Sequence, residues 1–97
     1  MTGPGARRGV DTLGLYQESL QLARDLGYEV REEPLGELPG GRCTVNGAVR
    51  VLVNLEQPVA ERLDRLLRAL AADPRLKAEP KSRLLEARLK AVSAPPG

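Results

Sequence analysis

Cys43 is the one residue of this sequence that could serve as a nucleophile. It is the only cysteine, and the chain contains no histidine. A catalytic cysteine reacts as a thiolate, and a histidine base usually activates it in an electropositive setting. Arg42 and Arg50 are the basic residues expected near it. Because free cysteine is among the most buried residue types, we predict that Cys43 is a small apolar residue of the core.

The carboxylates do not form a candidate catalytic pair. Glu32 and Glu33 are the only two acidic residues that are adjacent in the chain. Neighbouring residues of a strand point to opposite faces, so these two side chains are not expected to share an acid–base site. Glu61 and Asp64 lie on one face of a predicted helix, where arginines four residues further on are expected to pair with them.

The sequence also lacks the residues that a structural zinc site or a phosphate-binding loop needs. Structural zinc sites take four ligands of the cysteine or histidine type, and this composition cannot supply them within one chain. Gly40-Gly41-Arg42 resembles a phosphate-binding turn, but neither G-x-x-x-x-G-K nor G-x-G-x-x-G occurs. The sequence therefore predicts no catalytic residue, no metal ligand, no cofactor and no enzymatic activity.

Basic residues are concentrated near the C-terminal end of the sequence. Residues 74–97 carry 6 basic and 2 acidic side chains, whereas residues 11–73 carry 7 basic and 11 acidic ones. This asymmetry fits an anionic partner, and it is also typical of a solvated helix face. The candidate interaction surface consists of seven residues on one predicted helix: Lys81, Arg83, Leu85, Arg88, Leu89, Lys90 and Val92.

These features favour a non-enzymatic protein-interaction or regulatory module, which binds another protein or a second copy of itself as a homodimer. The alternative is a small nucleic-acid-associated protein that uses the basic segment 74–92. Phosphate contacts would then dominate its affinity, although no known nucleic-acid-binding signature is present. Only Tyr16 and Tyr28 are aromatic, which leaves little material for base stacking.

Cysteine usage and hydropathy suggest where the protein is found. A single cysteine allows no internal disulfide, which fits a reducing compartment. No run approaches the roughly 18 consecutive apolar residues of a membrane span. No apolar run follows Arg7 and Arg8, as it would in a secretory signal. We expect a soluble, cytoplasmic domain without membrane insertion.

The elements that position these residues follow from apolar periodicity and from turn signals. A helix is predicted over residues 12–26, because apolar residues recur at helical spacing at Tyr16, Leu20 and Ala23. Gly27 stands where a left-handed C-cap is needed. Alternating apolar and charged residues then predict a strand over residues 28–33, which Pro34 ends.

The next two strands form a hairpin, over residues 42–45 and 48–55. Asn46-Gly47 between them is the strongest short-range hairpin signal. A two-residue loop pairs Cys43 with Arg50, whereas a three-residue loop pairs Cys43 with Val49. The second register gathers more apolar residues on one face, because a slip of one residue exchanges the two faces. We predict the three-residue loop on this ground.

Two further helices are expected, over residues 58–72 and 80–92. The first has the clearest amphipathic pattern, with Val59, Leu63, Leu66, Leu67 and Leu70. The predicted fold is α+β in the order α-β-β-β-α-α, with a small antiparallel three-stranded meander and helices on one face. Residues 1–11 and 93–97 lack periodicity and are predicted to be disordered, which leaves one domain over residues 12–92.

Residues 13–72 resemble the N-terminal part of ImmA/IrrE-type metallopeptidases. The similarity lies in Asp25-Leu26-Gly27-Tyr28-Glu29-Val30-Arg31, a later Pro34-Leu35, a Gly-rich turn, and Val51-Leu52-Val53-Asn54 before a long helix. In that family the helix carries H-E-x-x-H, which binds zinc and supplies the general base. Here the helix Val59–Ala72 has no histidine, so no metal-binding or catalytic residue carries over. The resemblance implies a shared scaffold, and a stand-alone bacterial family of unknown function fits the pattern equally well.

Overall fold

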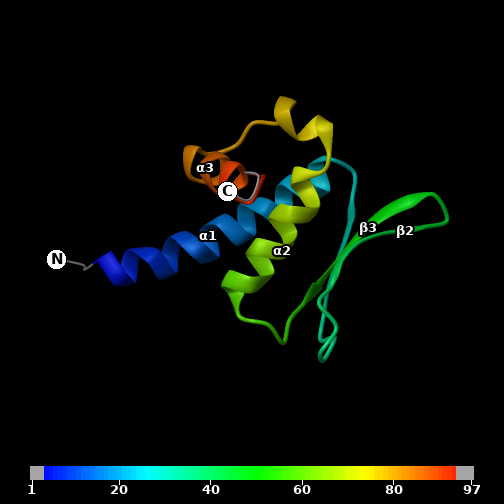
Figure 1. Cartoon of the computed structure of the whole chain (residues 1–97), viewed down its shortest axis with the longest axis horizontal. Coiled ribbons are helices and arrows are strands. Elements are labelled where there is room, and N and C mark those ends of the chain that lie inside the picture. Colours follow the sequence, from blue (N-terminus) through cyan, green and yellow to red (C-terminus); the bar gives the residue numbers. More distant parts are fainter. Residues whose placement is uncertain (1–3, 94–97) are drawn as a thin grey trace.

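The computed structural model describes residues 4–93, with side chains from Asp11 to Val92. Helices and strands follow one another in this range as α1 (Pro4–Asp25), β1 (Glu29–Glu33), β2 (Gly41–Val45), β3 (Ala48–Asn54), α2 (Val59–Ala71), the 3-10 helix η1 (Pro74–Ala78) and α3 (Arg83–Ser93) (Figure 1). The predicted α+β class is confirmed. None of the helices in the described range is long and apolar enough to cross a membrane.

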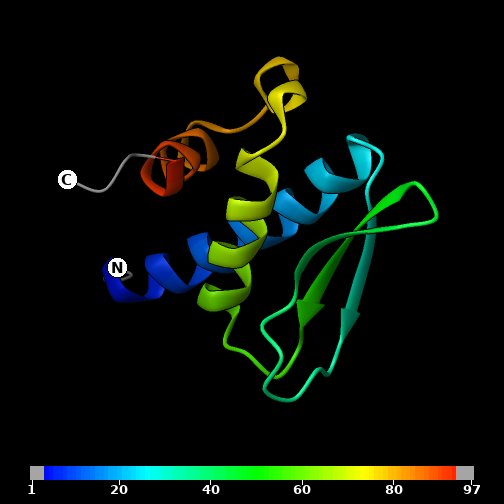
Figure 2. The same cartoon turned by 45° about the vertical axis from the view of Figure 1, so that its right-hand side comes forward.

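The helices form two levels on one side of the sheet. α1 and α2 cross each other against the sheet, and α3 lies on their far side (Figure 2). α2 has the amphipathic pattern predicted from the sequence, and its apolar stripe is fully buried at Leu63, Leu66, Leu67 and Leu70. Val51 and Val53 of β3 supply the sheet side of this core. Burial of such aliphatic side chains is the main stabilising contribution in a domain with so few aromatic residues.

The sheet is mixed, with the strand order β1-β3-β2. β1 runs parallel to β3, and β2 runs antiparallel to β3. The predicted antiparallel meander is therefore wrong, because β3 lies between the other two strands. The chain reaches this order by crossing the end of β3 between residues 34 and 40, which brings β2 to the far edge.

Two residues fix this crossing. At Gly40 the backbone has φ +79, and a Cβ atom there would lie 2.5 Å from the carbonyl oxygen of Leu52, so only glycine allows the close approach. The buried Asn54 side chain holds the crossing segment through hydrogen bonds. Its Oδ1 accepts from the backbone N–H of Leu35 at 3.0 Å, and its Nδ2 donates to the carbonyls of Gly36 and Leu38 at 2.9 and 2.8 Å.

The hairpin has the two-residue loop, so the predicted register is wrong. Asn46 and Gly47 both have positive φ, at 51 and 83, and Val45 pairs with Ala48. This is the turn whose twist matches that of the flanking strands. Burial does not favour the other register, because this end of the hairpin extends beyond the helices. Val45 and Ala48 are exposed there, so exchanging the two sheet faces would bury little additional apolar surface.

α1 begins eight residues before the predicted start. Pro4 fits the first turn of a helix, and Ala6, Arg7 and Arg8 are good helix formers that extend it towards the N-terminus. The prediction of disorder thus differs from the structure at residues 4–11, while residues 1–3 and 94–97 lie outside the described range.

The C-terminal end of α1 follows the sequence signal. Gly27 has φ +90, and the N–H of Tyr28 donates to the carbonyl of Ala23 at 3.0 Å, which completes a Schellman motif.

Candidate interaction site

The apolar residues of the candidate interaction surface are used within the domain. Leu85 and Leu89 are 0% and 6% exposed and belong to the main core, and Val92 packs against it. The charged residues Arg83, Arg88 and Lys90 remain exposed, whereas Lys81 is half-buried and donates from Nζ to the carbonyl of Glu79 at 2.7 Å. The seven residues therefore divide into an internal apolar stripe and an outer basic surface.

α3 is attached to α1 at its N-terminal end. Ser82 caps the helix, since its Oγ accepts from the backbone N–H of Leu85 at 3.2 Å. The Glu18 carboxylate of α1 accepts from the backbone N–H of Ser82 at 2.8 Å and from its Oγ at 2.7 Å. A carboxylate beside a helix N-terminus is favoured by the partial positive charge there. This contact sets the position of α3 relative to α1.

A groove opens between the C-terminal end of α2, η1 and α3, with a volume of about 560 Å³. Aliphatic residues form its floor: Ala71, Leu76 and Leu89. Three lysines line it as well: Lys77, Lys81 and Lys90. We call these six residues, together with the exposed Ala72, the α2–α3 groove.

Two carboxylates also line the α2–α3 groove, and each is next to a cation of the same chain. Glu86 Oε1 lies 3.8 Å from Nζ of Lys90, one turn along α3. Asp73 is held by Arg75, whose Nη2 donates to Oδ2 at 2.7 Å. The remaining lysine charges at Lys77 and Lys81 leave the groove positive.

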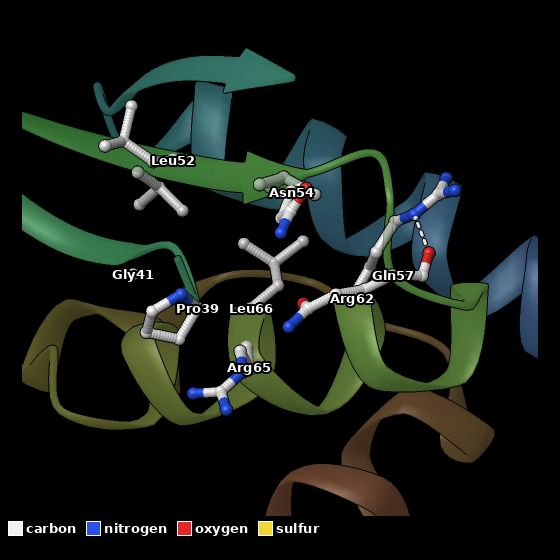
Figure 3. A pocket seen from close by; sticks show the side chains of 10 residues that line it. Pro39, Gly41, Leu52, Asn54, Gln57, Arg62, Arg65 and Leu66 are labelled. Atoms are coloured by element: carbon white, nitrogen blue, oxygen red, sulfur yellow. Dashed lines mark hydrogen bonds between the residues drawn. The ribbon is translucent and has the colours of Figure 1, made fainter. Parts of the chain in front are cut away.

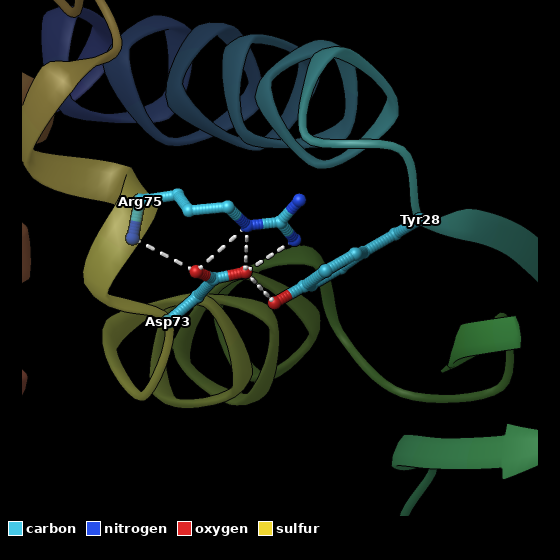
Figure 4. Close-up of polar contacts among 3 residues, drawn as sticks. All are labelled: Tyr28, Asp73 and Arg75. Atoms are coloured by element: carbon cyan, nitrogen blue, oxygen red, sulfur yellow. Dashed lines mark hydrogen bonds and ion pairs between the residues drawn. The ribbon is translucent and has the colours of Figure 1, made fainter. Parts of the chain in front are cut away.

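Asp73 is the centre of a polar cluster beside the groove (Figure 4). The hydroxyl of Tyr28 donates to Asp73 Oδ2 at 2.6 Å. The backbone N–H of Arg75 donates to Oδ1 at 2.9 Å, which caps η1. These bonds join the start of β1 to the turn between α2 and η1, two segments 45 residues apart in sequence.

The cluster shifts both of its titratable groups. The hydrogen bonds from the Arg75 side chain, the Tyr28 hydroxyl and the Arg75 backbone hold the pKa of Asp73 well below its usual range. Burial of Tyr28, followed by its hydrogen bond to Asp73, raises the pKa of that phenol. Asp73 is thus a stable anion at neutral pH, and Tyr28 a stable donor.

Positive charge continues from the groove towards the hairpin. The guanidinium carbon of Arg75 lies 5.9 Å from the centre of the Tyr28 ring, and that of Arg42 lies 5.7 Å from it. Both distances fall within the range of cation–π attraction. Sequence reasoning missed this cluster, since Asp73-Pro74 indicates the end of α2 and gives no sign of a partner at Tyr28.

Tyr16 forms a second buried contact, which involves one of the adjacent carboxylates. Its hydroxyl donates to Glu32 Oε2 at 2.8 Å, and Arg24 lies 3.9 Å from Oε1 of the same group. Burial and the hydrogen bond to Glu32 raise the pKa of Tyr16 to about 12. Glu33 lies on the other sheet face beside Arg31, so the two carboxylates do not share a site.

A small cavity lies between β3 and the N-terminal half of α2 (Figure 3). Its volume is about 10 Å³, which is room for roughly one water molecule. The Oε1 atom of Gln57, one of its lining residues, is buried without a hydrogen-bond partner among the described atoms. Arg62 closes one side by donating from Nε to the carbonyl of Gln57 at 2.7 Å. This cavity is too small for a substrate.

Cys43 does not lie in the core. It pairs with Arg50 across the hairpin and is half-buried, on the sheet face opposite Val51 and Val53. The expectation of a core cysteine is wrong because it rested on the three-residue loop. In the part of the chain that the structure describes, no group of three or more His, Cys, Asp or Glu side chains could hold a metal ion.

Comparisons with protein-family models, with curated proteins and with solved structures found no match to this chain. The resemblance to ImmA/IrrE-type metallopeptidases therefore stays a prediction.

Proposed function

We propose that this domain is a protein-interaction module and that the α2–α3 groove is its binding surface. The observation that carries the proposal is the combination of an aliphatic floor with a lysine lining in one groove. Partially buried apolar contact supplies affinity in protein interfaces, and surrounding charge supplies orientation and selectivity.

The state of the carboxylates supports binding rather than catalysis. A general acid or base needs a pKa near the working pH and a free path to the substrate. Asp73 has a pKa well below that range, and three donors occupy it. Glu86 is next to Lys90. The groove thus offers fixed charges and apolar contact.

Affinity capture from cells that express the protein tests the proposal. Lys77 and Lys90 line the groove, whereas Arg83 and Arg88 are exposed residues of α3 that do not line it. The double variants K77E/K90E and R83E/R88E change the net charge equally. We expect a specific partner to be captured by the native chain and by R83E/R88E, and lost with K77E/K90E.

Thermal unfolding of both double variants shows whether each of them is folded at the capture temperature. Equal loss of the partner with the two folded variants would contradict the proposal, because net charge and not the groove would then determine binding. Equal retention would contradict it as well, since the groove lysines would then contribute nothing.

A further inference from the structure

We infer that the α2–α3 groove binds an acidic protein segment that inserts an aliphatic side chain between the lysines. This inference rests on the proposed function and names the chemistry of the partner. It depends on the charge of the groove, on its floor, and on the contacts that its neighbours already make.

The charge of the groove favours a negative ligand. Lys77 is exposed and Lys81 is half-buried, and the structure gives neither of them a carboxylate within ion-pair distance among the described side chains. Next to the groove the exposed Arg42 adds a further cation over the Tyr28 ring, whereas the charge of Arg75 is paired with Asp73. An extended acidic segment would therefore meet cations both inside the groove and next to it.

The floor of the groove favours an aliphatic anchor. Leu76 and Leu89 are each 6% exposed, and their surfaces in the groove are aliphatic. The methylene stems of the lysines extend this apolar surface while their ammonium groups stay in water. A leucine, isoleucine or valine side chain of the partner would bury itself there, whereas a purely ionic ligand would leave the floor exposed to water.

A nucleic-acid backbone fits the groove less well than an acidic peptide does. A sugar–phosphate backbone carries no aliphatic side chain that could cover the floor at Leu76 and Leu89. Both tyrosines are buried, at 4% exposure, so neither offers the stacking platform that single strands use. The acidic strand β1 of a second copy is also a poor occupant of the groove. The exposed acids of β1 are engaged in the same chain, since Glu29 pairs with Arg31 and Arg50, both at 3.2 Å.

Fluorescence anisotropy with labelled probes tests the inference on the full chain. The probes are a short peptide of alternating aspartate and leucine, the same peptide with alanine for leucine, and a single-stranded oligodeoxynucleotide. We expect the leucine peptide to bind best, with affinity about tenfold lower for K77E/K90E and unchanged for R83E/R88E. The alanine peptide should bind about tenfold more weakly than the leucine peptide.

Ala72→Leu gives a test that leaves the charge unchanged. Ala72 is exposed in the groove with helical φ and ψ, so a larger side chain is compatible with the backbone there. We expect it to lower the affinity of the leucine peptide by filling part of the groove. The unfolding temperature reports whether this variant is folded.

Equal binding of the two peptides, or tighter binding of the oligonucleotide, would overturn the inference in favour of a general polyanion surface. Concentration-dependent self-association that K77E/K90E abolishes and R83E/R88E retains, without binding of the leucine peptide, would overturn it in favour of a second copy as the occupant of the groove. Absence of peptide binding together with groove-dependent capture of a cellular partner would overturn only the partner chemistry and leave the proposed function standing.

Discussion

Asp73 is the residue at which three parts of the chain meet: the end of α2, the start of η1 and the tyrosine that precedes β1. Its folded-state pKa lies well below the ordinary value of 3.8. A carboxyl whose pKa is lower in the folded state stabilises the fold above its unfolded pKa, and this contribution disappears as pH falls towards the folded pKa. We predict that stability falls as pH is lowered from about 5 to about 2, and that Asp73→Asn reduces this slope. Thermal unfolding across that range measures both effects.

Asp64→Asn is the matched control for Asp73→Asn. Asp64 makes an exposed pair with Arg68 one turn along α2, at 2.9 Å. Such pairs contribute only about 0–1 kcal/mol, so we expect a small effect at neutral pH. If both variants behaved alike at neutral pH and in acid, the contacts of Asp73 with Tyr28 and Arg75 would not contribute specifically to stability.

The position of Cys43 gives a second prediction. It lies on the sheet face away from the helices and is half-buried. We therefore expect Cys43→Ala to lower the free energy of unfolding by less than about 1 kcal/mol, whereas Val51→Ala, on the core face at 1% exposure, should lower it by about 2 kcal/mol or more. Denaturant unfolding of the two variants measures the difference. Equal costs would indicate that the other hairpin register is correct.

The elements differ in how far the sequence determines them. α2 is predictable because its pattern is local: Leu63, Leu66, Leu67 and Leu70 recur at helical spacing. The sheet order depends instead on contacts between distant residues, chiefly Asn54 with the segment that follows β1. Likewise, the hairpin register depends on how far the helices extend over β2, which cannot be derived from β2 itself. The α2–α3 groove is likewise only partly predictable. Two of its lysines belong to the basic surface predicted from the sequence, whereas its shape depends on the position of η1.

Two glycines test the crossing between β1 and β2. Gly40 has φ +79, and its Cβ would meet the Leu52 carbonyl, whereas Gly14 of α1 has nothing within 4 Å of that position. We predict that Gly40→Ala lowers the free energy of unfolding by about 2 kcal/mol or more. Gly14→Ala should raise it by about 0.5–1 kcal/mol, because alanine is the better helix former. Denaturant unfolding shows whether each variant raises or lowers the free energy of unfolding. If Gly40→Ala left that free energy unchanged, the segment between β1 and β2 would not approach β3 this closely.

In the molecule as a whole, α3 follows a connector that contains Pro74 and Pro80, which is an arrangement typical of a separable arm. In the structure Leu85 and Leu89 are buried in the same cluster as α1 and α2, and Leu76 of η1 joins them. A fully buried leucine contributes about 1.5–3 kcal/mol. A domain of this size has a total stability of about 0.05–0.15 kcal/mol per residue. Loss of three such residues would therefore remove most of the net stability.

The last prediction is that a chain ending at Asp73 does not fold on its own. Truncation removes the three leucines, the cap at Ser82 with its bonds to Glu18, and the Arg75 partner of Asp73. Circular dichroism and thermal unfolding of this truncated chain should show no cooperative transition. Two point variants of the full chain show whether loss of core packing, and not shortening of the chain, causes the effect. Leu85→Ala should lower the free energy of unfolding by about 2–5 kcal/mol. Leu84→Ala, at 56% exposure on the same turn, should lower it only slightly. A truncated chain that unfolds cooperatively would show that α1, α2 and the sheet form a sufficient core, with α3 as an attachment to it.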